Sequence, residues 1–148
     1  MDIISKIDML YDKENSASYK NLLELEAFSE RSDNLYSYFD LFISMLDDEK
    51  YAIRVRGFRL ICKQSKWDYE NKINKNIDKI LLILDDEKPT AVGQALQFLG
   101  HSLVPYKKEL GCKIKQAALS IDCTRFKADT MRPLIEKEVQ KLVKMCDY

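Results

Sequence analysis

The pentapeptide LDDEK occurs twice in this chain of 148 residues, at positions 46–50 and again at 84–88. The two copies start 84 − 46 = 38 residues apart. Self-similarity at a fixed spacing of about 20–50 residues is typical of proteins that stack similar structural units. The duplicated pentapeptide therefore predicts a chain of repeated units, and it constrains the fold more than any other feature of the sequence.

Apolar residues recur at helical spacing along almost the whole chain. Within residues 51–65, for example, Ile53, Gly57, Leu60 and Ile61 fall on one face of a helix. Glycine and proline, the usual residues of tight turns, number only 4 and 3, and no segment predicts a strand. The sequence predicts eight helices, at about 2–11, 17–30, 34–46, 50–65, 70–84, 89–103, 106–121 and 131–146.

The helices that follow the two pentapeptides match in the order of their residues. At an offset of 38, Gly57 falls on Ala95 and Leu60 falls on Phe98. One helix pair cannot bury its own apolar face, so such pairs stack and a helix closes the stack at each end. We therefore expect an all-α fold, an α-α superhelix that forms a single domain over residues 1–148. Its three helix pairs are expected at 17–46, 50–84 and 89–121.

One segment predicts the centre of this stack. The run Ile80-Leu81-Leu82-Ile83-Leu84 is apolar on every side of its helix. A helix that is apolar all round is covered by neighbours on more than one side. The segment 70–84 is therefore expected to be the most buried helix.

The repeated segments resemble HEAT repeats. The matching residues are the acidic turn Asp47-Asp48, the dipeptide Ile53-Arg54 and the small residue Gly57. The resemblance implies that an aspartate of the turn pairs with an arginine of the first helix across neighbouring units. Arg54 fits this role, and its candidate partners are Asp48, Asp85 and Asp86. Val92 stands where the second arginine would be, so the ladder of such pairs is expected to be incomplete.

The whole chain also resembles a group of small bacterial HEAT-like proteins, most closely over residues 50–68 and 85–99. That group is often labelled SufBD, after an iron–sulfur assembly scaffold. The label finds no support in this sequence, because the scaffold is rich in β-structure and this chain is expected to be all helix.

Charge is distributed unevenly although the net charge is zero. Residues 1–50 hold 5 basic and 12 acidic residues, which gives −7, and residues 51–148 hold 19 and 12, which gives +7. An asymmetry of this kind can steer a charged partner or favour contact between copies. It is equally compatible with an ordinary solvated surface.

Several kinds of site and location are disfavoured. The four cysteines are dispersed and His101 is the only histidine, so no metal or other cofactor is expected. No stretch is long and apolar enough for a membrane helix, and the first residues do not form a secretory signal. A cytoplasmic protein with no membrane contact is the expectation.

The most distinctive expected surface is a basic stripe on the helix 50–65, formed by Arg56, Arg59, Lys63 and Lys66. Helical spacing places these four cations on one face, opposite the apolar one. The stripe could hold a phosphate backbone, an acidic peptide or the acidic half of another copy. The alternative is a solvated helix face without a binding role.

Aromatic residues accompany basic ones at two helix corners. Trp67 follows the stripe, and an exposed tryptophan beside arginine is common at the centre of protein interfaces. Trp67 could instead be packed in the corner between two helices. Tyr106 and Lys107 lie one repeat later, since 106 − 68 = 38, and could form part of a ridge.

No catalytic signature is present in the sequence. It lacks a Gly-rich phosphate loop and the short motifs of metalloproteases and serine hydrolases. We therefore expect a non-enzymatic module that binds a protein partner, with self-association as one form of that binding. The alternative is a HEAT-like nucleic-acid-binding or DNA-base-repair protein, which the zero net charge disfavours.

Overall fold

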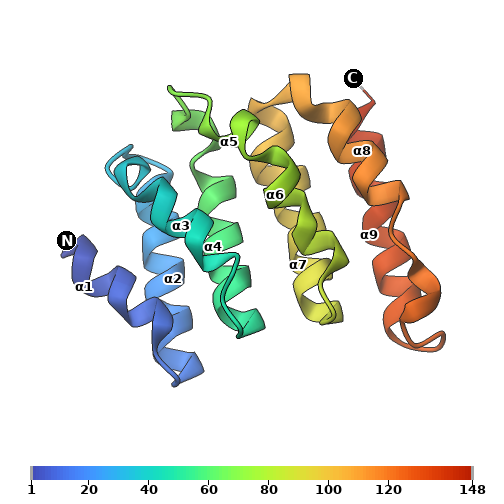
Figure 1. Cartoon of the computed structure of the whole chain (residues 1–148), viewed down its shortest axis with the longest axis horizontal. Coiled ribbons are helices and arrows are strands. Elements are labelled where there is room, and N and C mark those ends of the chain that lie inside the picture. The colour runs from blue at the N-terminus through green and yellow to red at the C-terminus, as the bar shows by residue number, and fades with distance from the viewer. Residues whose placement is uncertain (1, 148) are drawn as a thin grey trace.

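The computed structural model describes residues 2–147, and every regular element in that range is a helix (Figure 1). The predicted all-α class is confirmed. The α-helices are α1 (Ile3–Asp8), α2 (Asn15–Ser29), α3 (Phe39–Met45), α4 (Tyr51–Lys63), α5 (Lys72–Lys75), α6 (Ile77–Leu81), α7 (Pro89–Phe98), α8 (Gly111–Leu119) and α9 (Met131–Cys146). Short 3-10 turns are η1 (Met9–Tyr11), η2 (Tyr36–Tyr38), η3 (Ser65–Trp67), η4 (Leu82–Asp85), η6 (Val104–Tyr106), η7 (Lys108–Leu110) and η8 (Cys123–Arg125), and η5 (Leu99–Leu103) is a π-helical turn.

The helices form two layers (Figure 1). The long-helix layer consists of α2, α4, α7 and α9, which contact one another in that order. The short-helix layer consists of α1, α3, α6 and α8, and each packs on the long helix that follows it, α6 through the turn η4. The chain thus alternates between the layers, and its apolar core lies between them.

The centre of the molecule is α4 and not the predicted segment 70–84. All residues from Val55 to Cys62 are buried, because α4 is flanked by α2 and α7 within its layer and covered by α3. In the segment 70–84, Leu81 is buried as expected, but Leu82 is 63% exposed. The other four residues of the apolar run are buried, so the run is exposed only on the side of Leu82.

Several predicted helices are shorter in the structure. The segment 70–84 is divided into α5, α6 and η4, and Asn71 before α5 adopts a left-handed conformation with φ 54°. α5 ends at Asn76, whose side-chain Nδ2 donates to the Lys72 carbonyl at 2.7 Å, in addition to the backbone N–H of the same residue at 3.1 Å. The segment 106–121 becomes α-helical only at Gly111. The 3-10 turns η6 and η7 precede it, and Lys107 between them is buried and has a non-helical backbone.

One aspartate turn recurs four times and explains the repeated pentapeptide. In each turn a carboxylate Oδ1 accepts the backbone N–H of the residue two positions later, at 2.8–3.0 Å. The aspartates are Asp12, Asp48, Asp86 and Asp122. Each turn leads from the short-helix layer to the next long helix, and the spacings are 48 − 12 = 36, 86 − 48 = 38 and 122 − 86 = 36. The sequence displays only the two middle copies as an identical string.

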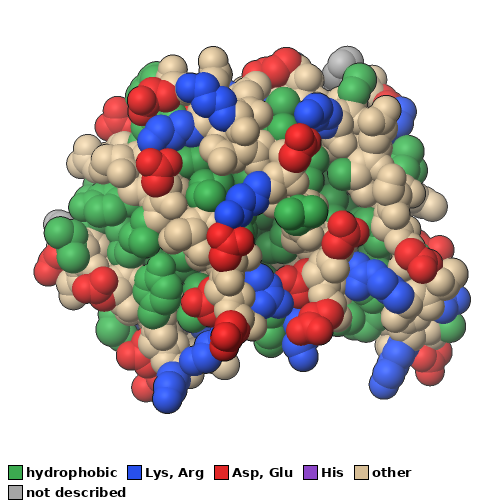
Figure 2. Space-filling view, in the orientation of Figure 1, with side chains coloured by type: hydrophobic (Ala, Val, Ile, Leu, Met, Phe, Trp, Pro, Cys, Tyr) green, Lys and Arg blue, Asp and Glu red, His purple; other side chains and the backbone are tan. Residues whose placement is uncertain are grey.

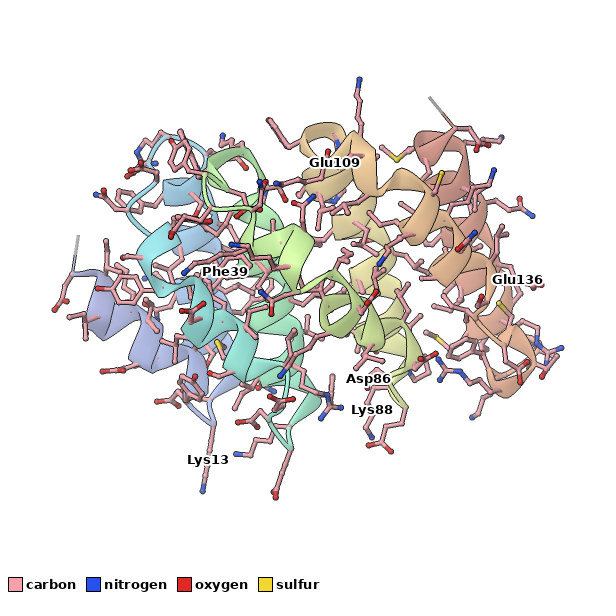
Figure 3. The ribbon with its side chains drawn as sticks, turned by 45° about the horizontal axis from the view of Figure 1, so that its top comes forward. Lys13, Phe39, Asp86, Lys88, Glu109 and Glu136 are labelled. Atoms are coloured by element: carbon pink, nitrogen blue, oxygen red, sulfur yellow. The ribbon has the colours of Figure 1, made fainter. Side chains whose placement is uncertain are left out.

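The labelled residues of Figure 3 show where these turns lie. Lys13 belongs to the first turn, and Asp86 and Lys88 belong to the third. All three appear along the same lower edge of the molecule, while Phe39 of α3 lies in its interior. Turns that are far apart in the sequence therefore lie along the same edge of the molecule.

Arg54 links two of these turns. Its Nε and Nη2 donate to the two carboxylate oxygens of Asp86, at 2.7 and 3.1 Å, and its Nη1 donates to the carbonyl of Asp48 at 2.9 Å. Of the three candidate partners, Asp86 forms the ion pair, and Asp48 takes part only through its backbone. Arg125 makes the equivalent contact to the next aspartate turn. Its Nη1 donates to the Asp86 carbonyl at 2.8 Å, as Arg54 Nη1 does to the Asp48 carbonyl.

Candidate interaction surfaces

The basic stripe does not form an exposed face. Arg56 and Arg59 are each only 7% exposed, because α4 lies in the middle of the long-helix layer with α2 on one side and α7 on the other. The prediction of an exposed, solvated stripe is therefore wrong for its first two residues. Helical spacing placed the four cations on one face correctly, but that face contacts α2.

Arg59 joins three helices. Its Nε and Nη2 donate to the carboxylate of Glu26 on α2, both at 2.8 Å, and its Nη1 donates to Gln94 on α7 at 3.1 Å. The guanidinium also lies 4.4 Å from the ring centroid of Phe98. With side chains 9% and 8% exposed, Arg59 and Glu26 form a buried ion pair inside the layer.

The other two residues of the stripe pair at the end of α2. Lys63 and Lys66 contact the two carboxylate oxygens of Glu30, at 2.8 and 3.1 Å. The hydrogen bond from Lys63 lowers the pKa of Glu30. Both lysines are about one-fifth exposed, so they lie at the rim of the contact between α2 and α4.

These pairs use part of the uneven distribution of charge along the sequence. Within residues 2–147, four of the twelve acidic residues of the first 50 positions pair with basic residues that follow them by 32 to 36 positions. Two of the four are Glu26 and Glu30. On the surface of the short-helix layer, Lys72 pairs with Asp40 and Lys79 pairs with Asp47.

Trp67 is packed in the corner between two helices and is not an exposed interface residue. It is half-buried, and its indole Nε1 donates to the Ser29 carbonyl at 2.7 Å. Lys66 lies 5.3 Å from the ring centroid. The residue therefore fixes η3 against the end of α2.

The predicted ridge does not form at Tyr106 and Lys107, because only one of the two residues is on the surface. Tyr106 is 53% exposed, but Lys107 is buried and forms a 2.9 Å ion pair with Asp68. Asp68 also accepts the Tyr36 hydroxyl at 2.6 Å and the backbone N–H of Ile73 at 3.0 Å. Burial and the hydrogen bond to Asp68 raise the pKa of Tyr36 to about 12. Lys107 is therefore part of a buried polar cluster and is not available to a partner.

The more open surface lies on the short-helix layer, which sequence reasoning did not select. A groove of about 350 Å³ runs between α6–η4 and α8, with Leu81, Leu82, Leu84, Lys113 and Ala117 among its lining residues. A smaller hollow of about 90 Å³ lies on the other side of Leu82, between the end of α3 and η4. Figure 2 shows this face, where apolar side chains are exposed between charged ones.

Two leucines stand out on this face. Leu82 is 63% exposed, although the other residues of its apolar run are buried, and Leu119 is 59% exposed. They occupy equivalent positions in neighbouring units at the offset of 37 residues, since 119 − 82 = 37. That equivalence is visible in the sequence, but the exposure of the two side chains is not.

His101 is exposed, and its Nδ1 lies 3.0 Å from the Ser102 hydroxyl. Partial burial, together with the positive charge of Lys63, lowers its pKa. Across residues 2–147 no three His, Cys, Asp or Glu side chains are close enough together to hold a metal ion. In the same range no helix has both the length and the apolar character needed to cross a membrane.

No family model, no curated protein and no solved structure matches this chain.

Proposed function

We propose that this chain is a HEAT-like α-α superhelix that holds a protein partner and carries out no catalysis. The recurrent aspartate turns support a repeat architecture, and so does the pairing of Arg54 with Asp86 in the next unit. Solenoids of this class bind partners on extended surfaces formed by successive units. A cytoplasmic location is part of the same proposal.

The proposed binding surface is the groove between α6–η4 and α8. Complete burial of a leucine side chain contributes about 1.5–3 kcal/mol, so two exposed leucines beside a groove provide much of the free energy that a modest interface needs. Leu82 lines this groove of about 350 Å³, and Leu119 is exposed on α8, the helix that forms the other side of the groove. A partner can therefore gain apolar contacts without rearranging the helices.

The chemistry of the groove indicates the kind of partner. A groove between two helices suits an amphipathic helix whose apolar face lies against it. Asp78 and Asp85 line the same groove and are exposed. Asp78 pairs with Lys113 of the groove at 3.2 Å, so Asp85 is the carboxylate that offers a counter-charge to a basic residue on the flank of the partner helix. We therefore expect a partner segment with an apolar face and a basic edge.

The alternative of a nucleic-acid-binding protein depended on an exposed basic stripe, and the stripe is not exposed. Arg56 and Arg59 are buried, and Lys63 and Lys66 contact Glu30. Cations used in this way cannot form the continuous row of phosphate contacts that duplex binding needs.

The test begins with affinity capture from an extract of the source cells, followed by calorimetry with the purified partner. Leu82→Asp combined with Leu119→Asp should weaken binding at least tenfold. Leu134→Asp on α9 is the matched control, because Leu134 is 57% exposed but lies on the other layer. Equal affinities for wild type and the double variant would contradict the proposal. Sedimentation of the chain alone tests whether the partner is a second copy.

A further inference from the structure

The opposite face of the molecule carries a second hollow, of about 240 Å³, on the long-helix layer. It lies between the N-terminal halves of α2, α4 and α7, which all begin at the same lower end of the molecule (Figure 1). Its lining includes Asn15, Tyr19, Tyr51, Arg56, Arg59 and Thr90. Two guanidinium groups line this hollow, and none of its lining residues is acidic.

Arg56 is the unusual member of this lining. Its side chain donates to the Leu10 carbonyl at 2.7 Å and to the Asn15 side-chain oxygen at 3.2 Å, and both acceptors are neutral. Within residues 2–147 no carboxylate lies within 4 Å of it, whereas Arg54 and Arg59 each have one. A buried cation is normally paired, since burial without a counter-charge is strongly unfavourable.

Arg56 also retains unused hydrogen-bonding capacity. A guanidinium has five N–H donors, and only one each from Nη1 and Nη2 is used within the described chain. Burial lowers the pKa of Arg56, and the attraction of the more distant Asp12 offsets only part of this effect. The residue is 7% exposed and borders an open hollow, so an anion placed there could approach it directly.

Other groups make the hollow favourable for negative charge. The hydroxyls of Tyr51 and Thr90 belong to its lining, and Lys88 lies 5.7 Å from the ring centroid of Tyr51. Tyr51 and Thr90 stand in the first turns of α4 and α7, where the helix dipole is positive. These helices have 13 and 10 residues, so both dipoles are well developed.

We propose that this hollow binds a small anion that carries a phosphate group, with Arg56 as its counter-charge. Phosphate suits the site better than a carboxylate, because its several acceptor oxygens can accept from a guanidinium fork and from hydroxyls at once. The shared chemistry is the phosphate group, whether as inorganic phosphate or as a small phosphomonoester. The site is independent of the partner groove, which lies on the other layer.

The test is thermal unfolding of the full chain in chloride buffer, with inorganic phosphate or phenyl phosphate added at constant ionic strength. A ligand that binds only the folded state raises the melting temperature, by about 5–10 °C at a hundredfold excess over Kd for a chain of this size. We expect a saturating rise. A larger rise with phenyl phosphate would indicate a phosphomonoester that also contacts the two tyrosines.

Variants separate specific binding from the general stabilisation that phosphate salts cause. Arg56→Gln should remove the rise, and in phosphate-free buffer it should melt no lower than wild type, since it removes an uncompensated charge. Tyr51→Phe combined with Thr90→Val should reduce the rise in melting temperature that phosphate causes. This double variant tests the site if Arg56→Gln does not fold. Arg31→Gln, at an exposed arginine, should retain it. No saturating rise in wild type, or an equal rise in these site variants, would overturn the proposal.

Discussion

Arg59 and Lys107 each place a cation against a carboxylate that lies more than 30 positions away in the sequence. Arg59 pairs with Glu26, and Lys107 pairs with Asp68. In both pairs the two side chains are less than 10% exposed. Such pairs are costly to break, because the partner that remains is a buried charge without compensation. We infer that they determine how neighbouring helices align.

A double-mutant cycle on Glu26 and Arg59 tests this inference. Glu26→Gln and Arg59→Met should each lower the free energy of unfolding by about 3–5 kcal/mol, as expected when one member of a buried pair is removed. The double variant should lose much less than the sum of the two, which urea unfolding would measure.

Glu30→Gln is the control for this cycle, because the Glu30 side chain is 55% exposed. An exposed pair contributes at most about 1 kcal/mol. Additive losses in the cycle, or equal losses at positions 26 and 30, would show that the buried pair has no special role.

The pH dependence of stability should report on Asp68. Burial by itself raises the pKa of this carboxyl, but hydrogen bonds from Tyr36 and Lys107 outweigh burial and hold the pKa below its ordinary value. A pKa that is lower in the folded state adds stability above the unfolded value of about 3.9, and this stability is lost as the pH falls through the folded pKa.

The difference in free energy of unfolding between wild type and Asp68→Asn should therefore be largest near neutral pH. It should begin to shrink near pH 4, where the Asp68 carboxyl becomes neutral in the unfolded chain, and it should be lost as the pH falls through the lower pKa of the folded state. Urea unfolding at a series of pH values measures this difference. A difference that stays constant down to about pH 2 would exclude a contribution from the carboxylate charge.

Among the elements, α3 and α4 approach most closely at Gly57. A Cβ atom placed there would lie 2.6 Å from the Cβ of Met45 and 2.9 Å from the Phe42 carbonyl oxygen. Gly57→Ala should therefore cost about 1–3 kcal/mol, the usual range for overpacking a core. Thermal unfolding measures the loss.

Gly93 on α7 is the matched control for Gly57. The nearest atom to a Cβ there would be Ile135 Cδ1 at 3.6 Å, which is an ordinary contact. Gly93→Ala should be neutral or stabilise the helix by up to about 1 kcal/mol. If both alanine variants melt alike, the close approach of α3 and α4 does not depend on glycine.

Leu81 and Leu82 are adjacent but differ in environment, being 9% and 63% exposed. Leu81→Asp should unfold the protein, because burying an isolated carboxylate costs several kcal/mol against a total stability of about 5–15 kcal/mol. Leu82→Asp should fold normally. Circular dichroism during heating distinguishes the two, and a wild-type melting temperature for Leu81→Asp would contradict the core assigned here.

The elements also show which features a single sequence can predict. The recurrence of LDDEK and the helical spacing of apolar residues were sufficient for the all-α class and the positions of all eight helical segments. They could not show that Asn76 interrupts the segment 70–84, because an asparagine within a helix either faces solvent or bonds to the backbone. They also could not distinguish Leu81 from Leu82 within one apolar run.

At the scale of the whole molecule, the chain uses part of its charge asymmetry to hold its own helices together. Four acidic residues of the first 50 positions pair with basic residues of later helices, and these pairs range from buried to exposed. A row of cations at helical spacing has the same sequence pattern whether it faces water or an acidic neighbouring helix. The stripe could therefore be located from the sequence, but its burial could not.

Charge reversal of Arg56, Arg59 and Lys63 to Glu tests whether the basic stripe is buried against α2. At positions 59 and 63 the new carboxylates would face Glu26 and Glu30, and at position 56 the new carboxylate would be buried against the neutral Leu10 carbonyl and Asn15. The loss should exceed the total stability of the chain, about 5–15 kcal/mol. The control reverses three exposed lysines, Lys20, Lys108 and Lys137.

The measurement is thermal unfolding of both triple variants, followed by far-UV circular dichroism. We predict that the stripe variant shows no cooperative transition and little helix, while the control variant melts within a few degrees of wild type. A stripe variant that remains helical and melts at the wild-type temperature would contradict the burial of the basic stripe, because α4 would then not present its cations to α2.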